Sequence, residues 1–316
     1  MKLRQLRYFA EIVESGSLSE ASRRLHVVQP ALSRSLADLE AELATPLLVR
    51  SRVGVQPTAA GQLLHAQARL IARQVETAAA LVRECGNTPQ GKLSIGVLRS
   101  DAPALAGTLF RALQQELPLV TSEIIVGYSS DLLEHLRLAE LDFTMYVATP
   151  DDAHAPGTEL RQERFCLLGP APLMPTDGNS VTLDQLAGLP LLLTTKRPVH
   201  KALLFAAASR QIAINIVGGI DDSLATVELC AEGVAATLLP QASAMTLARR
   251  FGLHTALLDE PTLTRRVMLL AQPDVPRTAA SLAAEHIVRR LAQAQLATSL
   301  PPPPSHAVSR RKRSRS

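Results

Sequence analysis

The sequence predicts an α/β protein of two or three domains, in which a helix-rich N-terminal part precedes a region of alternating strands and helices. At 316 residues, the chain is longer than one average domain. Hydrophobic residues make up 47% of it, aromatic residues only 3%, and there is no tryptophan. A large apolar fraction with so few aromatic side chains favours helices over an all-β sandwich.

Composition excludes several other classes of protein. Cys85, Cys166 and Cys230 lie far apart without a C-x-x-C pair, so we expect reduced thiols and no metal clamp. Charged residues interrupt the N-terminal stretch where a signal peptide needs an apolar run, and no segment has the roughly 18 consecutive apolar residues of a membrane span. The sequence therefore predicts a soluble, cytoplasmic protein with no membrane partner.

The net charge of +4 comes from the end of the chain. Five of the last seven residues are basic, and without them acidic and basic residues are almost equal in number. Residues 300–316 contain four prolines in a row, Pro301 to Pro304, and end in this basic run, so we expect a disordered tail. The tail either adds non-specific affinity for DNA or has no function. Because the rest of the chain is nearly neutral, a charged binding surface must come from a local cluster of basic residues and not from the net charge.

The first 57 residues predict three helices and a two-stranded wing. Apolar residues at three- to four-residue spacing indicate the buried stripe of a first helix: Leu3, Leu6, Phe9 or Ala10, and Val13. Gly16 ends this helix, and the capping box from Ser17 to Glu20 opens a second. Pro30 suits the first turn of a third helix, because its missing N–H would have no partner there.

The third helix has two different faces. Its predicted buried face consists of Leu32, Leu36, Leu39 and Leu43. The opposite face is small, polar and cationic, with Pro30, Arg34, Ala37 and Ala41, and Ser33 on its flank. Such a face suits close approach to a DNA groove. The segment that follows predicts a hairpin around Gly54, on which Arg50 and Arg52 share one face and would neutralise phosphates.

Residues 58–86 predict a long linker helix that begins after Thr58. Its apolar residues step by four and three, the period of a coiled-coil seam: Leu64, Ala68, Ile71, Val75, Ala78 and Val82. We expect this helix to pair with its twin in at least a dimer, which implies a pseudo-palindromic DNA site. The alternative is that the stripe packs on its own domain.

Residues 87–299 predict an α/β domain. Strands are expected at 93–97, 124–126, 141–147, 164–169, 191–194, 215–217, 235–239 and 265–270, and helices at 103–116, 131–139, 199–211 and 278–296. This alternation indicates a parallel sheet.

An enzyme is not supported by any motif. The chain has no G-x-S-x-G, no Walker sequence and no H-E-x-x-H, so we expect no catalytic residue, no metal and no cofactor. Asp221 and Asp222 are interpreted as the cap of a helix at 223–231 rather than as an acid/base pair. A transport solute-binding protein is the other alternative, but it would require export.

The segment LRYFAEIVESGSLSEASRRLHVVQPALSRSLADLEAELATPLLVRSRVGVQPTAAG resembles the signature of LysR-type transcriptional regulators. The resemblance implies a winged helix-turn-helix that binds double-stranded DNA, with base contacts from Gln29, Pro30, Ser33 and Arg34. Contacts to the DNA backbone would come from Ser19, Arg50 and Arg52, although the Ser19 hydroxyl has an alternative role as a helix cap. The resemblance also implies a homotetramer built from dimers, and RNA polymerase as a partner if the protein is an activator.

The C-terminal half resembles the two-lobed, periplasmic-binding-protein-like effector domain of the same family, with crossovers near residues 160 and 264. The run INIVGGIDDSLATVELCAEGVAATLLPQASA is similar to the nitrogen-assimilation-control branch, while Glu140 and Ala235 stand where the family usually has glycine. We expect a small-molecule effector at the ends of strands in the cleft between the lobes, contacted by Arg99, Ser100, Asp101, Thr194 and Thr195. Alternatively, Ser100 and Thr195 merely cap the helices that follow.

Overall fold

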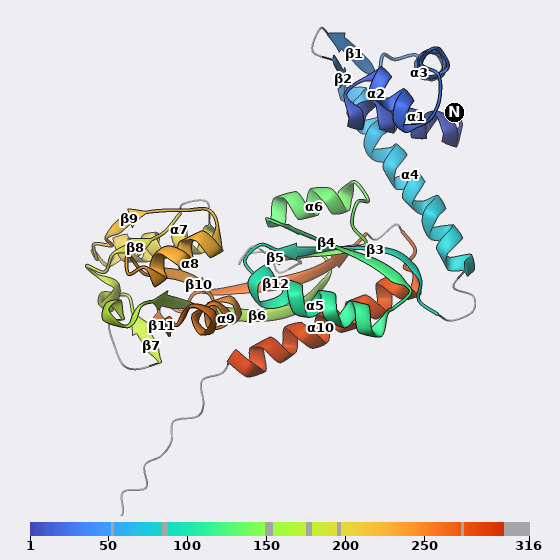
Figure 1. Cartoon of the computed structure of the whole chain (residues 1–316). Coiled ribbons are helices and arrows are strands. Elements are labelled where there is room, and N and C mark those ends of the chain that lie inside the picture. The colour runs from blue at the N-terminus through green and yellow to red at the C-terminus, as the bar shows by residue number, and fades with distance from the viewer. Residues whose placement is uncertain are drawn as a thin grey trace, which may run out of the picture. The chain divides into compact units, whose positions relative to one another are not determined.

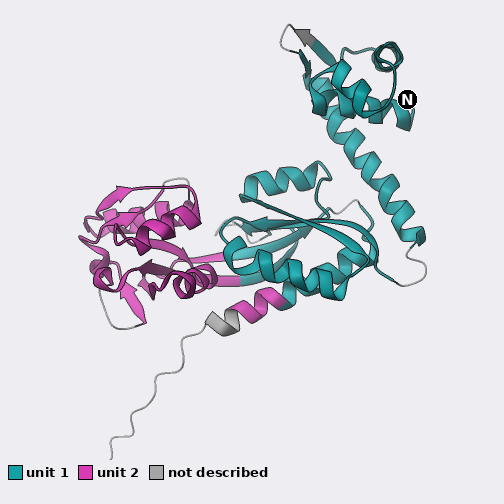
Figure 2. Ribbon diagram, in the orientation of Figure 1, with its two compact units in different colours: residues 1–161, 266–290 teal, residues 162–265, 291–316 magenta. Residues whose placement is uncertain are grey.

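The structure is a computed structural model of the chain, and it describes residues 1–51, 54–83, 88–148, 154–174, 179–194, 197–272 and 275–299 (Figure 1). It forms two compact units (Figure 2). Unit 1 contains residues 1–161 and 266–290, and unit 2 contains residues 162–265 and the chain from 291 onward. The chain therefore crosses between the units twice, close to the crossovers expected near residues 160 and 264.

Unit 1 begins with three helices and a hairpin, as predicted. These elements are α1 (Leu3–Ser15), α2 (Leu18–Arg24), α3 (Gln29–Leu43), β1 (Leu48–Ser51) and β2 (Gly54–Pro57). Their shared core contains Phe9, Ile12, Leu32, Leu39 and Leu47, which are almost fully buried.

For two residues of the predicted buried stripes, the prediction of burial is wrong. Leu3 is 57% exposed and Leu43 is 39% exposed, because each lies at the end of its helix where no neighbouring element covers it.

Backbone contacts fix the turns of this domain. Gly16 ends α1 with a φ of 64°, and its carbonyl accepts a hydrogen bond from the Val55 N–H at 2.9 Å. The Ser17 hydroxyl caps α2 by accepting the Glu20 N–H. A Cβ on Gly54 would lie 2.7 Å from the Gly16 carbonyl oxygen. The hairpin is thus tied directly to the turn between α1 and α2.

Helix α4 (Ala59–Arg83) follows the hairpin. Its predicted cap is confirmed, because the Thr58 hydroxyl accepts the Gly61 N–H at 3.0 Å. A Cβ on Gly61 would lie only 2.1 Å from the Leu47 carbonyl oxygen, so this position requires glycine. The close approach sets the direction in which α4 leaves the hairpin.

The rest of unit 1 is a sheet covered by helices on both faces. Its strands are β3 (Gly91–Leu98), β4 (Val120–Gly127), β5 (Phe143–Ala148) and β12 (Thr264–Ala271), in the order β4-β3-β5-β12. Figure 1 shows α6 (Ser129–Arg137) on one face, and α5 (Ala102–Glu116) and α10 (Ala279–Ser299) on the other. The turn before β5 forms despite Glu140, because Ala139 takes the positive φ of 56° and the Glu140 N–H bonds to the His135 carbonyl.

Unit 2 is built around β6 (Thr158–Gly169), which enters it from unit 1. β10 (Thr237–Pro240) and β11 (His254–Glu260) pair with β6, and β7 (Ser180–Thr182) pairs with β11. A second small sheet contains β8 (Leu191–Leu192) and β9 (Ile216–Gly218). The helices are α7 (Pro198–Ser209), α8 (Ser223–Ala231) and α9 (Gln241–Phe251), with short 3-10 turns η2 (Ala171–Leu173) and η3 (Asp184–Leu186).

The prediction of a parallel sheet is wrong in part. β3 is parallel to β4 and β5, but β12 is antiparallel to β5, and both β10 and β11 are antiparallel to β6. β11, β7 and α9 were not predicted at all. Simple alternation of strands and helices misses these pairings, because β12 returns to unit 1 from the opposite direction.

Among the residues that the structure describes, no helix has the length and apolar character to cross a bilayer.

Ala44 ends α3 in the left-handed conformation, with a φ of 50° and a ψ of 33°. A Cβ makes this conformation unfavourable, so Ala44→Gly is expected to raise the free energy of unfolding by about 0.5 to 1 kcal/mol. Ala37→Gly, in the exposed interior of α3, is the matched control and is expected to lower it by about 1 kcal/mol. Urea unfolding of both variants measures the difference. A loss of stability in Ala44→Gly would contradict the assignment of strain to this residue.

Candidate functional site

The predicted base-contacting residues lie at the start of α3. Gln29, Pro30 and Arg34 are exposed, and Ser33 is half-buried. The hydroxyl of Ser19, in the first turn of α2, donates a hydrogen bond to Oε1 of Gln29 at 3.2 Å. The two helices thus present a continuous polar surface, which we call the α2–α3 face and define by Ser19, Gln29, Pro30, Ser33 and Arg34.

The hydrogen bond between Ser19 and Gln29 determines which groups of these two side chains are already occupied. Ser17, not Ser19, caps α2, so the alternative role of Ser19 as a cap is not seen in this structure. Within the described ranges, Nε2 of Gln29 has no hydrogen-bond partner, and Arg34 makes no ion pair. Both groups are therefore available to an outside acceptor.

The neighbouring arginines differ from Arg34. Arg23 and Arg24 both pair with Glu20, and Arg24 also reaches Glu11 at 3.3 Å. The hydrogen bond from Arg24 lowers the pKa of Glu20 below its ordinary value, so this carboxylate stays charged. The charges of Arg23 and Arg24 on α2 are thus partly cancelled, whereas Arg34 forms no ion pair within the described residues.

The hairpin is attached to α3 through Glu40. One carboxylate oxygen of Glu40 accepts the N–H groups of Leu47 at 2.7 Å and Leu48 at 3.3 Å. The sequence did not reveal this role, although Glu40 lies within the segment that resembles the LysR-type signature. Arg50 lies in β1 opposite Val55, and Arg52 lies outside the described residues.

In unit 1, the predicted effector residues follow the end of β3. The Arg99 guanidinium lies 5.2 Å from the centre of the Tyr128 ring, and the Ser100 hydroxyl donates to Asp101 at 3.2 Å. Asp101 is only 1% exposed and forms an ion pair with the equally buried Arg161, a partner that the sequence did not reveal. Ser100 does not cap α5, whose N-cap residue is Asp101.

In unit 2, Thr194 is held by the buried His200. Nδ1 of His200 accepts the Thr194 N–H at 3.0 Å, and Nε2 donates to the Leu238 carbonyl at 3.2 Å. Burial lowers the pKa of His200 below its ordinary value, so the ring is neutral and fits this donor and acceptor pair. Thr195 lies outside the described residues.

The start of α8 settles another sequence interpretation. Oδ1 of Asp222 accepts the N–H groups of Leu224 and Ala225, both at 3.0 Å. Asp222 is therefore a helix cap, as predicted, and not part of an acid/base pair. Nearby, Nη2 of Arg197 donates to the Ser223 hydroxyl at 3.1 Å.

The predicted seam of α4 divides into two parts. Leu64 packs against the N-terminal core and Ala68 is buried within the chain, so the alternative of packing on the same domain is correct for these two residues. Ile71 is half-buried. Val75 is 49% exposed, Val82 is 73% exposed, and Ala78 between them is also exposed.

Within the described residues, no three His, Cys, Asp or Glu side chains are placed to hold a metal ion. Cys166 and Cys230 are buried, and burial raises the pKa of each thiol to about 12. Neither thiol has the character of a reactive cysteine.

Comparisons with known proteins agree with this arrangement. Residues 3–62 match the model described as "Bacterial regulatory helix-turn-helix protein, lysR family", and residues 86–314 match "LysR substrate binding domain". The nitrogen assimilation regulatory protein nac of Klebsiella aerogenes is 32% identical over 271 residues, which cover 85% of this chain and 88% of that protein.

Solved structures are similar over almost the whole chain. A mutant of OxyR from Corynebacterium glutamicum with bound H2O2 is 26% identical, covers 94% of this chain and 96% of its own, and has a TM-score of 0.56. Full-length CbnR complexed with its target DNA is 22% identical, covers 92% of this chain and 100% of its own, and has a TM-score of 0.64. The likeness to CbnR concerns the fold.

Proposed function

Because the chain belongs to the lysR family of bacterial regulatory helix-turn-helix proteins, we propose that it reads its DNA site through the α2–α3 face, as a homo-oligomer that responds to a small-molecule effector. It is a DNA-binding transcriptional regulator and not an enzyme. The observation that carries the proposal is the exposed start of α3, where Gln29 is fixed by Ser19 and Arg34 is unpaired within the described part of the chain.

The chemistry of this face fits the major groove. An arginine donates two hydrogen bonds to the O6 and N7 atoms of guanine, and a glutamine pairs with the N6 and N7 atoms of adenine. Arg34 and Gln29 are thus the base-reading candidates, with Ser33 and Pro30 at close range. Arg50 and Arg52 would contact phosphates, which position the protein without reading sequence. A phosphate contact from Ser19 would replace its hydrogen bond to Gln29, because the hydroxyl has only one proton to donate.

Arg34→Ala is expected to weaken binding to the specific site by about 1 to 3 kcal/mol while leaving binding to random DNA almost unchanged, because a base contact is lost. Arg111→Ala, at an exposed position of α5 in the other part of unit 1, is the matched control and should leave both affinities unchanged. Fluorescence anisotropy with the two DNAs at one salt concentration makes the measurement. Equal weakening on both DNAs would show that Arg34 contacts only the backbone.

We propose that the exposed residues Val75, Ala78 and Val82 of α4 contact the same residues of a second copy. They step by three and four residues, which places them on one stripe of the helix. Burying such exposed valine side chains against a second copy would lower the free energy of the assembly. A dimer would carry two recognition helices, which is consistent with a pseudo-palindromic site and with further assembly to a tetramer. RNA polymerase is the further partner if the output is activation.

Val75→Glu is expected to give monomers, because it places a charge in an apolar contact. The matched control is Gln62→Glu, which adds the same charge to the opposite face of α4, where the side chain is exposed. Light scattering of both variants measures their masses. A dimer or tetramer of unchanged mass in Val75→Glu would exclude this stripe as the interface.

We propose that the effector is an anion contacted by Ser100 and Arg99, which follow β3 of unit 1. Contacts from Thr194 and Thr195 stay predictions from the sequence. Asp101 would oppose an anion if its charge were free, but the buried ion pair with Arg161 cancels that charge. His200 acts as a positioning residue, since it fixes the backbone of Thr194. The helix N-termini that follow these residues also favour negative charge.

Ser100→Ala is expected to weaken binding of the effector by about fivefold or more, because a neutral hydrogen bond contributes about 1 kcal/mol. Small carboxylates are first screened by thermal shift on the full chain, and the affinity of any hit is then measured by calorimetry. Ser209→Ala, which removes an exposed hydroxyl from α7, is the control. Unchanged affinity in Ser100→Ala would remove this residue from the site.

A peroxide signal is not supported by the two cysteines that the structure describes. Oxidation by peroxide requires an accessible thiolate, whereas Cys166 and Cys230 are buried with pKa values of about 12. The similarity to an OxyR with bound H2O2 therefore does not extend to these side chains.

A further inference from the structure

Two arginines of α4, one helical turn apart, hold the corner between α6 and β5. Nε of Arg69 donates to the Leu138 carbonyl at 3.2 Å, and Nη2 lies 3.2 Å from Oε1 of Glu140. Arg73 forms an ion pair with Asp142, whose second oxygen accepts the Ser94 N–H at 2.8 Å. These contacts join the helix that carries the DNA-binding domain to the sheet of unit 1.

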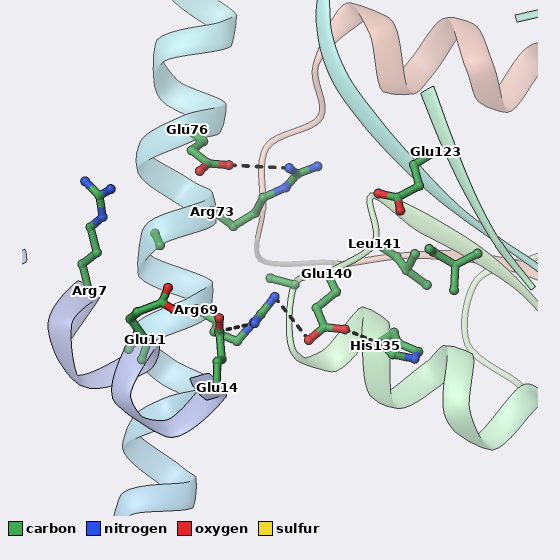
Figure 3. Close-up of a pocket in the computed structure, with 15 residues that line it drawn as sticks. Arg7, Glu11, Glu14, Arg69, Arg73, Glu76, Glu123, His135, Glu140 and Leu141 are labelled. Carbon is green, nitrogen blue, oxygen red and sulfur yellow. Dashed lines mark hydrogen bonds and ion pairs between the residues drawn. The ribbon is translucent and has the colours of Figure 1, made fainter. Parts of the chain in front are cut away.

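Arg69 also joins α1 to this corner. It forms an ion pair with Glu14 of α1, which lies 3.4 Å from Nε2 of His65. The hydrogen bond from His65, with the charge of Arg69 beside it, lowers the pKa of Glu14 below its ordinary value. Figure 3 shows Arg69 between Glu14 and Glu140, with His135 beyond Glu140.

The junction is not a packed apolar core. A cavity of about 520 Å³ lies beside these ion pairs, and α4 contributes only the small side chains of Ala68 and Ala72 between its charged residues. Arg7, Glu11, Glu76 and Glu123 also line the cavity. Because little apolar surface is available for packing here, the charged contacts decide how firmly α4 is held.

The two pairs differ in how easily they separate. Asp142 and Arg73 are the less exposed, with side-chain exposures of 12% and 18%. Separating them would leave a poorly solvated carboxylate, so this pair acts as a pivot. Arg69 and Glu140 are 25% and 27% exposed, and each has another partner on its own side, Glu14 and His135 respectively. They can therefore separate without leaving either charge alone.

We propose that Glu14, Arg69, Glu140, Arg73 and Asp142 form a clamp that fixes α4 to the β4-β3-β5-β12 sheet, and that release of Arg69 from Glu140 frees the DNA-binding domain to turn. The regulatory meaning of this movement rests on the proposed function. The clamp itself is a mechanical property of unit 1 and does not depend on DNA.

The test measures the distance between α3 and α5 by dipolar electron resonance. Spin labels are attached at Ala37→Cys and Arg111→Cys, both exposed positions, in a Cys85→Ser chain, because Cys166 and Cys230 are buried. About tenfold excess of unlabelled chain suppresses signals between copies. At low salt, we expect one narrow distance distribution for the otherwise unchanged chain.

Glu140→Arg is expected to broaden this distribution at least about twofold, and Glu140→Gln to broaden it less. The triple variant Glu14→Arg, Arg69→Glu and Glu140→Arg should restore the narrow distribution, because both ion pairs of residue 69 are re-formed with exchanged charges. The control Glu134→Arg changes the same charge on α6, where Glu134 pairs only with Arg137 of its own helix among the described residues, and should have no effect. Raising the salt concentration from about 0.05 to 0.5 M should broaden the distance distribution of the unsubstituted chain as well, because salt screens the ion pairs.

A distribution of unchanged width in both Glu140 variants would overturn the clamp. So would a triple variant whose distribution stays as broad as that of Glu140→Arg while its circular dichroism matches that of the unsubstituted chain. Binding to specific and random DNA is measured in parallel on unlabelled versions of these chains in which Ala37 and Arg111 are kept, because a label at Ala37 would stand on the face of α3 that approaches DNA. Absence of specific binding by the unsubstituted chain would refute the proposed function, whereas the distance distributions would still decide the clamp.

Discussion

The N-terminal half of unit 1 depends on the backbone of Leu47. Its N–H is held by the Glu40 carboxylate of α3, and its carbonyl accepts the Thr58 N–H at 2.9 Å, directly before α4. Gly61 passes so close to the same carbonyl that no side chain fits. The recognition helix, the hairpin and the linker helix therefore meet at one residue, and their directions are set together.

Buried charge marks both places where the chain crosses between the units. Arg161 and Arg265 stand at the two boundaries, and each pairs with a carboxylate of its own unit, Asp101 and Glu163. Such pairs lose much of their Coulombic gain to desolvation, so they contribute less to stability than to the definition of one arrangement. At each crossing, the charge of the buried arginine is therefore balanced by a carboxylate of the same unit.

The sequence predicted local features well and long-range ones poorly. The three helices, the Ser17 and Thr58 caps and the exposed start of α3 follow from periodicity and capping within a few residues. The antiparallel pairing of β12 and the Asp101–Arg161 pair join residues distant in sequence, so no local pattern contains them. In the α4 seam, Leu64 and Ala68 are covered within the chain, which a heptad pattern cannot reveal, while dimer contacts of Val75, Ala78 and Val82 stay a prediction.

The hydrogen bond from Ser19 to Gln29 has a consequence for how such a face changes over generations. A side chain already held in one rotamer loses less conformational entropy when it meets a base, and it tolerates fewer alternative bases. A residue that need not touch a base thus sets the discrimination of one that does. Drift at position 19 would alter which promoters are recognised while every base-contacting residue stayed the same.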